Sequence, residues 1–149
     1  MRNTFVALTF ILLSTINYAC DCSVQTEMSL EYHRSALVIV GKVTKITKSA
    51  DQRQFIVTIE VEKDFKGNTK GQKIIITTNS SGRACGYEFR VGQNYLIYAN
   101  KDKRNVRNWT TSVCSRTCPL KAAKEDLSFI TRETDTEFHP NWEGQFRDQ

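Results

Sequence analysis

Three things are scarce in this sequence of 149 residues: histidine, long hydrophobic runs and recognisable catalytic motifs. The two histidines, His33 and His139, have no acidic partner or nucleophile motif, so we expect a protein that is not an enzyme. Beyond residue 19 no stretch approaches the roughly 20 apolar residues that span a bilayer, so no transmembrane segment is predicted. Internal repeats, low-complexity tracts and linkers are also absent, which is typical of a single domain.

The first 19 residues have the pattern of a secretory leader. Arg2 supplies a positive charge, Phe5–Leu13 is apolar apart from one threonine, and Ala19 is the small residue expected before a signal-peptidase cut. We therefore predict that residues 1–19 are a signal peptide and that the protein is secreted and extracellular. The alternative is a lipoprotein with an acylated Cys20, which would be periplasmic or held in the outer envelope.

The chain after the leader is predicted to form one domain over residues 20–132, followed by a polar tail over residues 133–149. Removal of Arg2 with the leader leaves 20 Lys and Arg against 16 Asp and Glu, a net charge of about +4. The excess is spread along the chain except in one basic loop, Lys101–Arg107. No aromatic interleaving or binding motif accompanies this loop, so we interpret it as a solvated hairpin tip and predict no nucleic-acid partner.

Five cysteines follow the leader, which indicates disulfides with one cysteine left over. Cys20 and Cys22 are too close in sequence to bond each other easily, so each needs a distant partner. Two bridges among five cysteines can form in 15 ways, and the sequence pattern does not choose between them. The spacings match no common zinc pattern, so no metal of its own is predicted. The five are Cys20, Cys22, Cys85, Cys114 and Cys118.

Hydrophobic periodicity predicts an all-β domain with a short helix at each end. The clearest strand follows residue 54, where Val57, Ile59 and Val61 face one way and Thr58 and Glu60 the other. This pattern alone does not separate an OB-like barrel from a compact sandwich. The expected strands are Leu37–Ile46 with a bulge at Gly41, Phe55–Glu62 with a turn over Phe65–Asn68, Ile74–Thr77, Tyr87–Val91, Tyr95–Ala99 and Trp109–Cys114. The expected helices are Ser23–Arg34 and Leu120–Ile130, the second with Lys124, Glu125 and Asp126 outside its apolar stripe.

A set of short stretches, in a fixed order, resembles one known family, the tissue inhibitors of metalloproteinases, in their N-terminal netrin-like domain. The likeness covers roughly residues 20–130 and implies a single-domain form with an OB-fold barrel of five to six strands. The stretches are Cys20-Asp21-Cys22, Val40-Gly41-Lys42-Val43, Asp64-Phe65-Lys66-Gly67, Cys85-Gly86-Tyr87, Tyr95-Leu96-Ile97-Tyr98-Ala99, and Thr111-Ser112-Val113-Cys114 with Pro119-Leu120 after it.

The resemblance implies the disulfides Cys20–Cys85 and Cys22–Cys114, which leave Cys118 unpaired. Three states of Cys118 stay open: a buried thiol, an intermolecular disulfide, or competition with Cys114 for Cys22. It also implies inhibition of zinc metalloendopeptidases: the α-amine and carbonyl oxygen of Cys20 would chelate the target's catalytic zinc and displace its water. No cofactor beyond that zinc is expected. The residues expected to contact the protease are Cys20, Asp21, Cys22, Ser23, Ser81, Gly82, Arg83 and Ala84.

Asp21 stands where these inhibitors usually carry Thr or Ser, at the residue that enters the enzyme's main specificity pocket. Burying an unpaired carboxylate is costly, so we expect either that the target offers a basic group or that inhibition of typical matrix metalloproteinases is weak or absent. Two other functions stay open at this point. One is a netrin-like protein-binding module without inhibitory activity, and the other is a lipid-anchored envelope protein whose acylated Cys20 cannot bind zinc.

Overall fold

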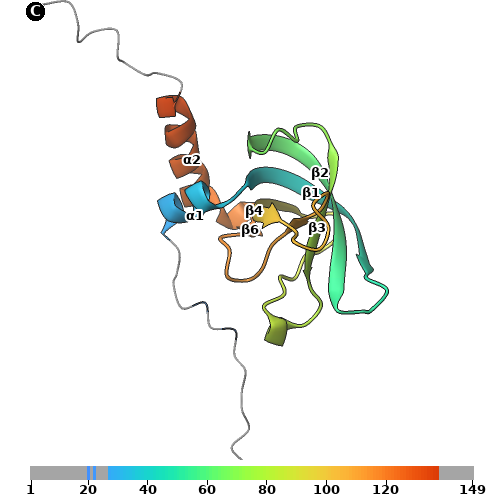
Figure 1. Ribbon diagram of the computed structural model, residues 1–149. Helices are drawn as coiled ribbons and strands as arrows, with labels where there is room; N and C mark the ends of the chain where they lie inside the picture. The colour runs from blue at the N-terminus through green and yellow to red at the C-terminus, as the bar shows by residue number, and fades with distance from the viewer. Residues whose placement is uncertain (1–19, 21, 23–26, 138–149) are drawn as a thin grey trace, which may run out of the picture.

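The computed structural model describes Cys20, Cys22 and residues 27–137 of the chain. In this part of the chain six strands form one sheet, with two α-helices beside it (Figure 1). The prediction of an all-β domain with short flanking helices is therefore confirmed. The elements in chain order are α1 (Met28–Arg34), β1 (Leu37–Lys48), β2 (Gln54–Lys66), β3 (Lys73–Asn79), the 3-10 helix η1 (Gly82–Ala84), β4 (Asn94–Lys101), β5 (Trp109–Thr110), β6 (Cys118–Pro119), the 3-10 helix η2 (Leu120–Ala122) and α2 (Lys124–Glu137).

Strands β1 and β2 form a long antiparallel hairpin and are the longest strands of the sheet. The alternation predicted for β2 is confirmed, because Val57, Ile59 and Val61 are buried and Glu60 is exposed. The predicted bulge is also present, since the register shifts between Val40 and Gly41. A Cβ on Gly41 would overlap the side chain of Ile59, so a larger residue would push β2 away.

Five of the six described strands close into a ring. β1 pairs with β2, β2 with β3, β3 with β5, β5 with β4, and β4 pairs back with β1. Every pairing is antiparallel except β3–β5, and β6 adds to the ring by pairing with β4. Both helices lie on one side of this ring, and η1 lies at the opposite end from α2 (Figure 1).

The core consists of two apolar clusters, one on each face of the first half of β1. This explains why residues 37–40 are apolar without alternation: both faces of the strand are covered there. The first cluster uses one face of all five ring strands, and the second packs the outer face against both helices. The first contains Leu37, Ile39, Val43, Val57, Ile59, Val61, Ile74, Ile76, Phe89, Tyr95, Ile97, Ala99 and Trp109. The second contains Tyr32, Val38, Val40, Leu96, Tyr98, Ala123 and Ile130.

The predicted strand at Tyr87–Val91 is wrong, since no strand forms between residues 80 and 93. Its alternating pattern arises from an aromatic cluster in which the Phe89 ring lies 4.7 Å from Tyr87 and 5.0 Å from Tyr95. Backbone donors here bond to side chains instead of a neighbouring strand: Tyr87 N donates to Thr78 Oγ1 at 2.8 Å. The alternation therefore matches the burial of Tyr87 and Phe89, but Val91 is exposed and the segment has no strand partner.

Other boundaries differ by a few residues. β2 continues to Lys66, so the turn expected over Phe65–Asn68 starts later. The strand expected over Trp109–Cys114 ends at Thr110, and beyond it Cys114 N donates to the Ser112 hydroxyl in a turn. α2 continues to Glu137, past the expected domain boundary at residue 132. With 14 residues it is the longest helix in the described part of the chain. None of the described helices is long and apolar enough to cross a membrane.

Candidate functional site

The two cysteines of the Cys20-Asp21-Cys22 segment are bonded to different parts of the domain. Cys20 bridges to Cys85 with a Cα–Cα distance of 5.4 Å, and Cys22 bridges to Cys114 at 5.2 Å. Both distances are usual for disulfides. Of the 15 pairings that the cysteine count leaves open, the one implied by the resemblance is confirmed. Residues 20 and 22 are therefore fixed to two loops, one after β3 and one after β5.

The loop Ser81–Ala84, which precedes the first of these attachment points, is held by its own hydrogen bonds. Its centre is the 3-10 helix η1, and the Ser81 carbonyl accepts from Gly86 N at 3.1 Å. The side-chain amide of Asn79, at the end of β3, donates to the Ala84 carbonyl. These contacts give the loop a defined shape without help from a partner.

Cys85 has a left-handed backbone, with φ of +62°, which is uncommon for a residue other than glycine. The chain then turns so tightly that a Cβ on Gly86 would overlap the carbonyl oxygen of Asn79. Val113 N donates to the Cys85 carbonyl at 3.1 Å, which joins the loop before Cys85 to the segment before Cys114. The two disulfides are thus attached to backbone segments that are bonded to each other.

Three of the expected contact positions are not described in full. Asp21 and Ser23 lie outside the described residues, and so does the side chain of Arg83. The remaining ones are placed at one end of the molecule by the two disulfides and the loop between them: Ser81, Gly82 and Ala84 are exposed, and Cys20 and Cys22 are half-buried.

A polar cleft of about 510 Å³ lies beside the Cys22–Cys114 bridge. α1 contributes Glu31 and Arg34 to its wall, and the basic loop contributes Arg104. Among the described residues that line it there is no histidine, and Glu31 is the one carboxylate, so these residues offer neither a metal-ligand set nor an acid–base pair. The lining residues are Cys22, Glu31, Arg34, Gln54, Asn79, Tyr98, Asn100, Arg104, Thr110, Thr111, Ser112, Cys114 and Ser115.

One group of potential metal ligands occurs in the described residues: the sulfur atoms of Cys20, Cys85 and Cys114, all within 4.8 Å of one another. Each of these sulfurs belongs to a disulfide, and metal ligation requires a thiolate. The group therefore shows that the two bridges lie side by side, and it is not a metal site in the oxidised protein.

No known family model matches this chain, and no curated protein matches it either.

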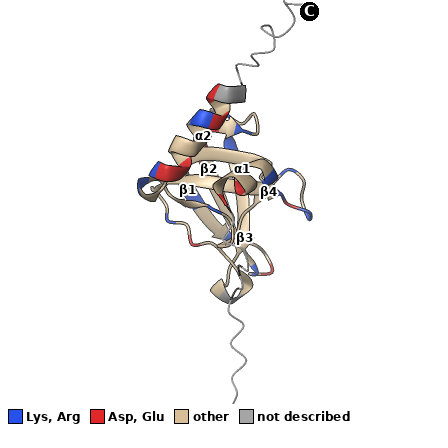
Figure 2. Cartoon of the chain, turned by 90° about the vertical axis from the view of Figure 1, so that its left-hand side faces the viewer, with Lys and Arg blue, Asp and Glu red and all other residues tan. Residues whose placement is uncertain are grey.

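Two cations of the basic loop Lys101–Arg107 have partners in the loop or directly after it. The Lys101 ammonium lies 3.5 Å from the centre of the Trp109 ring, and Arg104 lies 3.7 Å from the buried Asp102. Burial favours the neutral form of Asp102, but hydrogen bonds from Arg104 N and Thr77 Oγ1 outweigh it and lower the pKa. On the side of the molecule that carries both helices, basic and acidic segments alternate (Figure 2).

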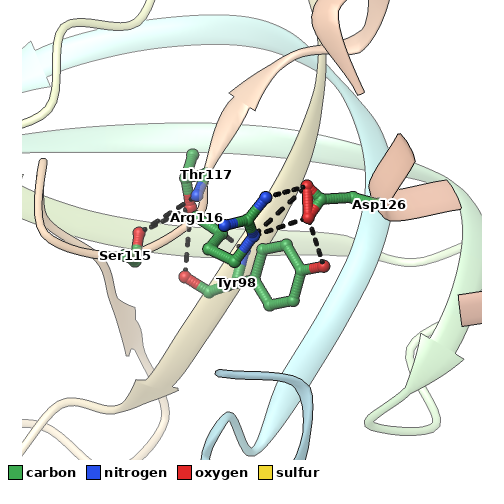
Figure 3. Close-up of polar contacts among 5 residues, drawn as sticks. All are labelled: Tyr98, Ser115, Arg116, Thr117 and Asp126. Carbon is green, nitrogen blue, oxygen red and sulfur yellow. Dashed lines mark hydrogen bonds and ion pairs between the residues drawn. The ribbon is translucent and has the colours of Figure 1, made fainter. Parts of the chain in front are cut away.

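A buried ion pair fixes α2 to the sheet, and sequence reasoning missed it (Figure 3). Asp126 was expected outside the apolar stripe of the helix, yet it is 5% exposed. Arg116 Nε donates to Asp126 Oδ1 at 2.6 Å, and this bond to the carboxylate raises the pKa of Arg116. The Tyr98 hydroxyl donates to the same carboxylate at 3.4 Å; burial first, and Asp126 second, raise the pKa of Tyr98. The partners are ten positions apart in the sequence, a separation that follows no helix or strand spacing and so does not predict the pair.

We expect Asp126→Ala to lower the free energy of unfolding by about 2 kcal/mol. This is less than the 3–5 kcal/mol typical of a broken buried pair, because the Arg116 side chain is 31% exposed and keeps access to water. Urea unfolding of the variant measures the loss. Asp135→Ala, an exposed position on the same helix, is the matched control and should cost under about 0.5 kcal/mol. Equal losses in the two variants would show that the pair contributes nothing.

Cys118, on β6, is free and half-buried, packed against the second core cluster. With Cys22 bonded to Cys114, Cys118 does not compete for Cys22 in this structure. Burial first, and the nearby Asp126 second, raise the pKa of its thiol. An intermolecular disulfide through Cys118 stays a prediction, and it would need this thiol to be uncovered.

Alkylation should report this environment directly, because the thiolate is the reactive form. A raised pKa leaves less thiolate at any given pH. We expect iodoacetamide to modify Cys118 in the folded protein at least about tenfold more slowly at pH 8 than in urea with the disulfides intact. The folded-state rate should still climb above pH 9, the ordinary thiol pKa. Equal rates in both states would mean that the thiol is exposed.

Proposed function

We propose that this chain is a secreted inhibitor of zinc metalloendopeptidases that binds the target's catalytic zinc through the α-amine and carbonyl oxygen of Cys20. The observation that carries the proposal is the double anchoring of residues 20 and 22 beside the exposed loop Ser81–Ala84. Cleavage after Ala19 would turn this anchored segment into a free N-terminus. A terminus fixed at two points presents its amine in one orientation.

The chemistry is that of a bidentate ligand for an open zinc. A catalytic zinc has three protein ligands and a water, and the amine and carbonyl of one residue replace the water in a five-membered chelate ring. The amine must be neutral to bind. Its ordinary pKa of about 7.7–8.0 means that the metal helps to remove the proton. Anchoring reduces the entropy lost when a flexible terminus is ordered on binding.

The same proposal places the chain with the tissue inhibitors of metalloproteinases and its ring of strands with the OB-fold. A five-stranded, partly open barrel is the description of an OB-fold, and the ring β1-β2-β3-β5-β4 supports that assignment. The disulfide pairing supports the family, because it is the pairing that the resemblance in sequence implies.

The test is inhibition of a panel of purified zinc endopeptidases by the secreted protein. Mass spectrometry first establishes whether Cys20 is the N-terminal residue and whether its amine is free. The panel should include enzymes with apolar specificity pockets and enzymes with a basic group there, because Asp21 should favour the second kind. A free Cys20 amine without inhibition of any enzyme would contradict the proposal and favour a binding module. An acylated amine would favour an envelope lipoprotein.

A further inference from the structure

The two disulfides lie close enough for thiol–disulfide exchange between them once one of them is opened to a thiolate. The sulfur atoms of Cys20, Cys85 and Cys114 lie within 4.8 Å of one another, although Cys114 is bonded to Cys22 and not to either of them. All three residues are half-buried, so solvent reaches the group. Exchange between disulfides proceeds by attack of a thiolate on a neighbouring sulfur, and proximity and access govern its rate.

The backbone also favours a new bond between Cys85 and Cys114. The hydrogen bond from Val113 N to the Cys85 carbonyl, 3.1 Å long, already holds these two segments side by side. A disulfide needs Cα atoms roughly 4.4–6.8 Å apart, and neighbouring segments joined in this way require little movement to reach that range. The close group of three sulfurs includes Cys114 and not Cys22, so the two ends of the Cys22–Cys114 bridge are not equivalent.

We propose that the two bridges form a redox relay, in which opening of Cys22–Cys114 transfers Cys85 from Cys20 to Cys114 and releases the N-terminal segment from both anchors. Neither disulfide would then hold residues 20 and 22 to the domain. The consequence for inhibition rests on the proposed function, since a released Cys20 no longer presents its amine and carbonyl in a fixed orientation. The relay itself does not depend on that function.

The steps balance with one external thiol, such as glutathione. Its thiolate attacks the sulfur of Cys22, the bond to Cys114 breaks, and Cys114 leaves as a thiolate. The Cys114 thiolate then attacks the sulfur of Cys85, the bond to Cys20 breaks, and Cys20 leaves as a thiolate that takes up a proton. Two disulfides are consumed and two are formed, namely Cys85–Cys114 and a mixed disulfide on Cys22. One external thiol is used and one protein thiol, Cys20, is freed.

The experiment maps disulfides in the full secreted protein carrying Cys118→Ser, which removes the remaining free thiol. The protein is titrated with glutathione, free thiols are alkylated, and tryptic peptides are analysed without reduction. Trypsin separates Cys85 from Cys114, because Arg90 and Lys101 lie between them. The expected product joins Cys85 to Cys114, carries one glutathione on Cys22 and is alkylated at Cys20. Appearance of Cys85 and Cys114 as alkylated thiols, never joined to each other, would overturn the relay.

Two matched variants in the same background test the direction of transfer. Cys22→Ser leaves a thiol at Cys114, inside the sulfur group, so Cys20 should become alkylated without any added glutathione. Cys114→Ser leaves the thiol at Cys22, outside the group, so the Cys20–Cys85 bridge should persist and protect Cys20. Equal protection of Cys20 in both variants would contradict the relay. If either variant fails to fold, the glutathione titration still decides.

The readouts separate this inference from the proposed function. Disulfide mapping uses no protease, so a protein that inhibits nothing can still show the rearrangement. If the native protein inhibits a zinc endopeptidase, the rearranged form should lose that inhibition and regain it when the native pairing is restored. Full inhibition by the rearranged form would show that the anchors are not needed for binding.

Discussion

One alanine added before Cys20 should abolish inhibition, with Ki for a sensitive enzyme raised by more than about 100-fold, or about 2.7 kcal/mol of binding free energy. The addition converts the α-amine of Cys20 into an amide nitrogen, which is a poor zinc ligand at neutral pH. The carbonyl alone cannot close the chelate ring. The added residue also occupies the space that the zinc must enter, and the two anchors prevent the segment from shifting to make room.

The cleanest control is the same molecule before and after removal of the extension. A cleavable N-terminal tag that leaves Cys20 as the first residue should give an inactive precursor and an active product. Thermal unfolding of the two forms should coincide, because the addition lies outside the described core. Full potency in the extended form would contradict the chelation model and would not bear on the fold or the disulfide pairing.

The sequence predicts those parts of the fold that depend on local periodicity. The strand with Val57 and Ile59 was found because a half-buried strand repeats every two residues, and the bulge at Gly41 because glycine interrupts a strand pattern. The prediction of a strand at Tyr87–Val91 was wrong because burial alternates only as far as Phe89, and backbone donors of the segment bond to side chains such as Thr78. Periodicity reports which side chains are buried and says little about what the backbone pairs with.

The candidate site also has parts that the sequence predicts and parts that it does not. The cysteines are visible in the sequence, and their pairing followed from the resemblance, but their proximity could not be predicted. Spans of 65 and 92 residues carry no information on whether two bridges lie side by side. The internal bonds of the loop Ser81–Ala84 and the Arg116–Asp126 pair are closer in sequence, but they follow no helix or strand periodicity, so the sequence pattern does not predict them either.

Removing either bridge should cost about the same stability, although the two close spans of different length. For Cys22→Ala with Cys114→Ala, the remaining Cys20–Cys85 bond already joins the chain. The second bridge then closes a path of only about 31 residues, made of the stretch from Cys85 to Cys114 and the step from Cys20 to Cys22. The same path applies when Cys20 and Cys85 are the pair removed.

A closed path of about 31 residues corresponds to about 4 kcal/mol in the chain-entropy model, for either double variant. This is a large part of the 5–15 kcal/mol that a typical domain has. Urea unfolding of the two double variants measures both losses, and Cys118→Ala is the control for loss of a cysteine without loss of a bridge. Losses that differ by more than about 1 kcal/mol would contradict the shared path, because loop length enters the chain-entropy model only as a logarithm. Equal losses of about 4 kcal/mol are what one double anchor of the N-terminal segment predicts, and that anchor is the arrangement that both the chelating terminus and the disulfide relay require.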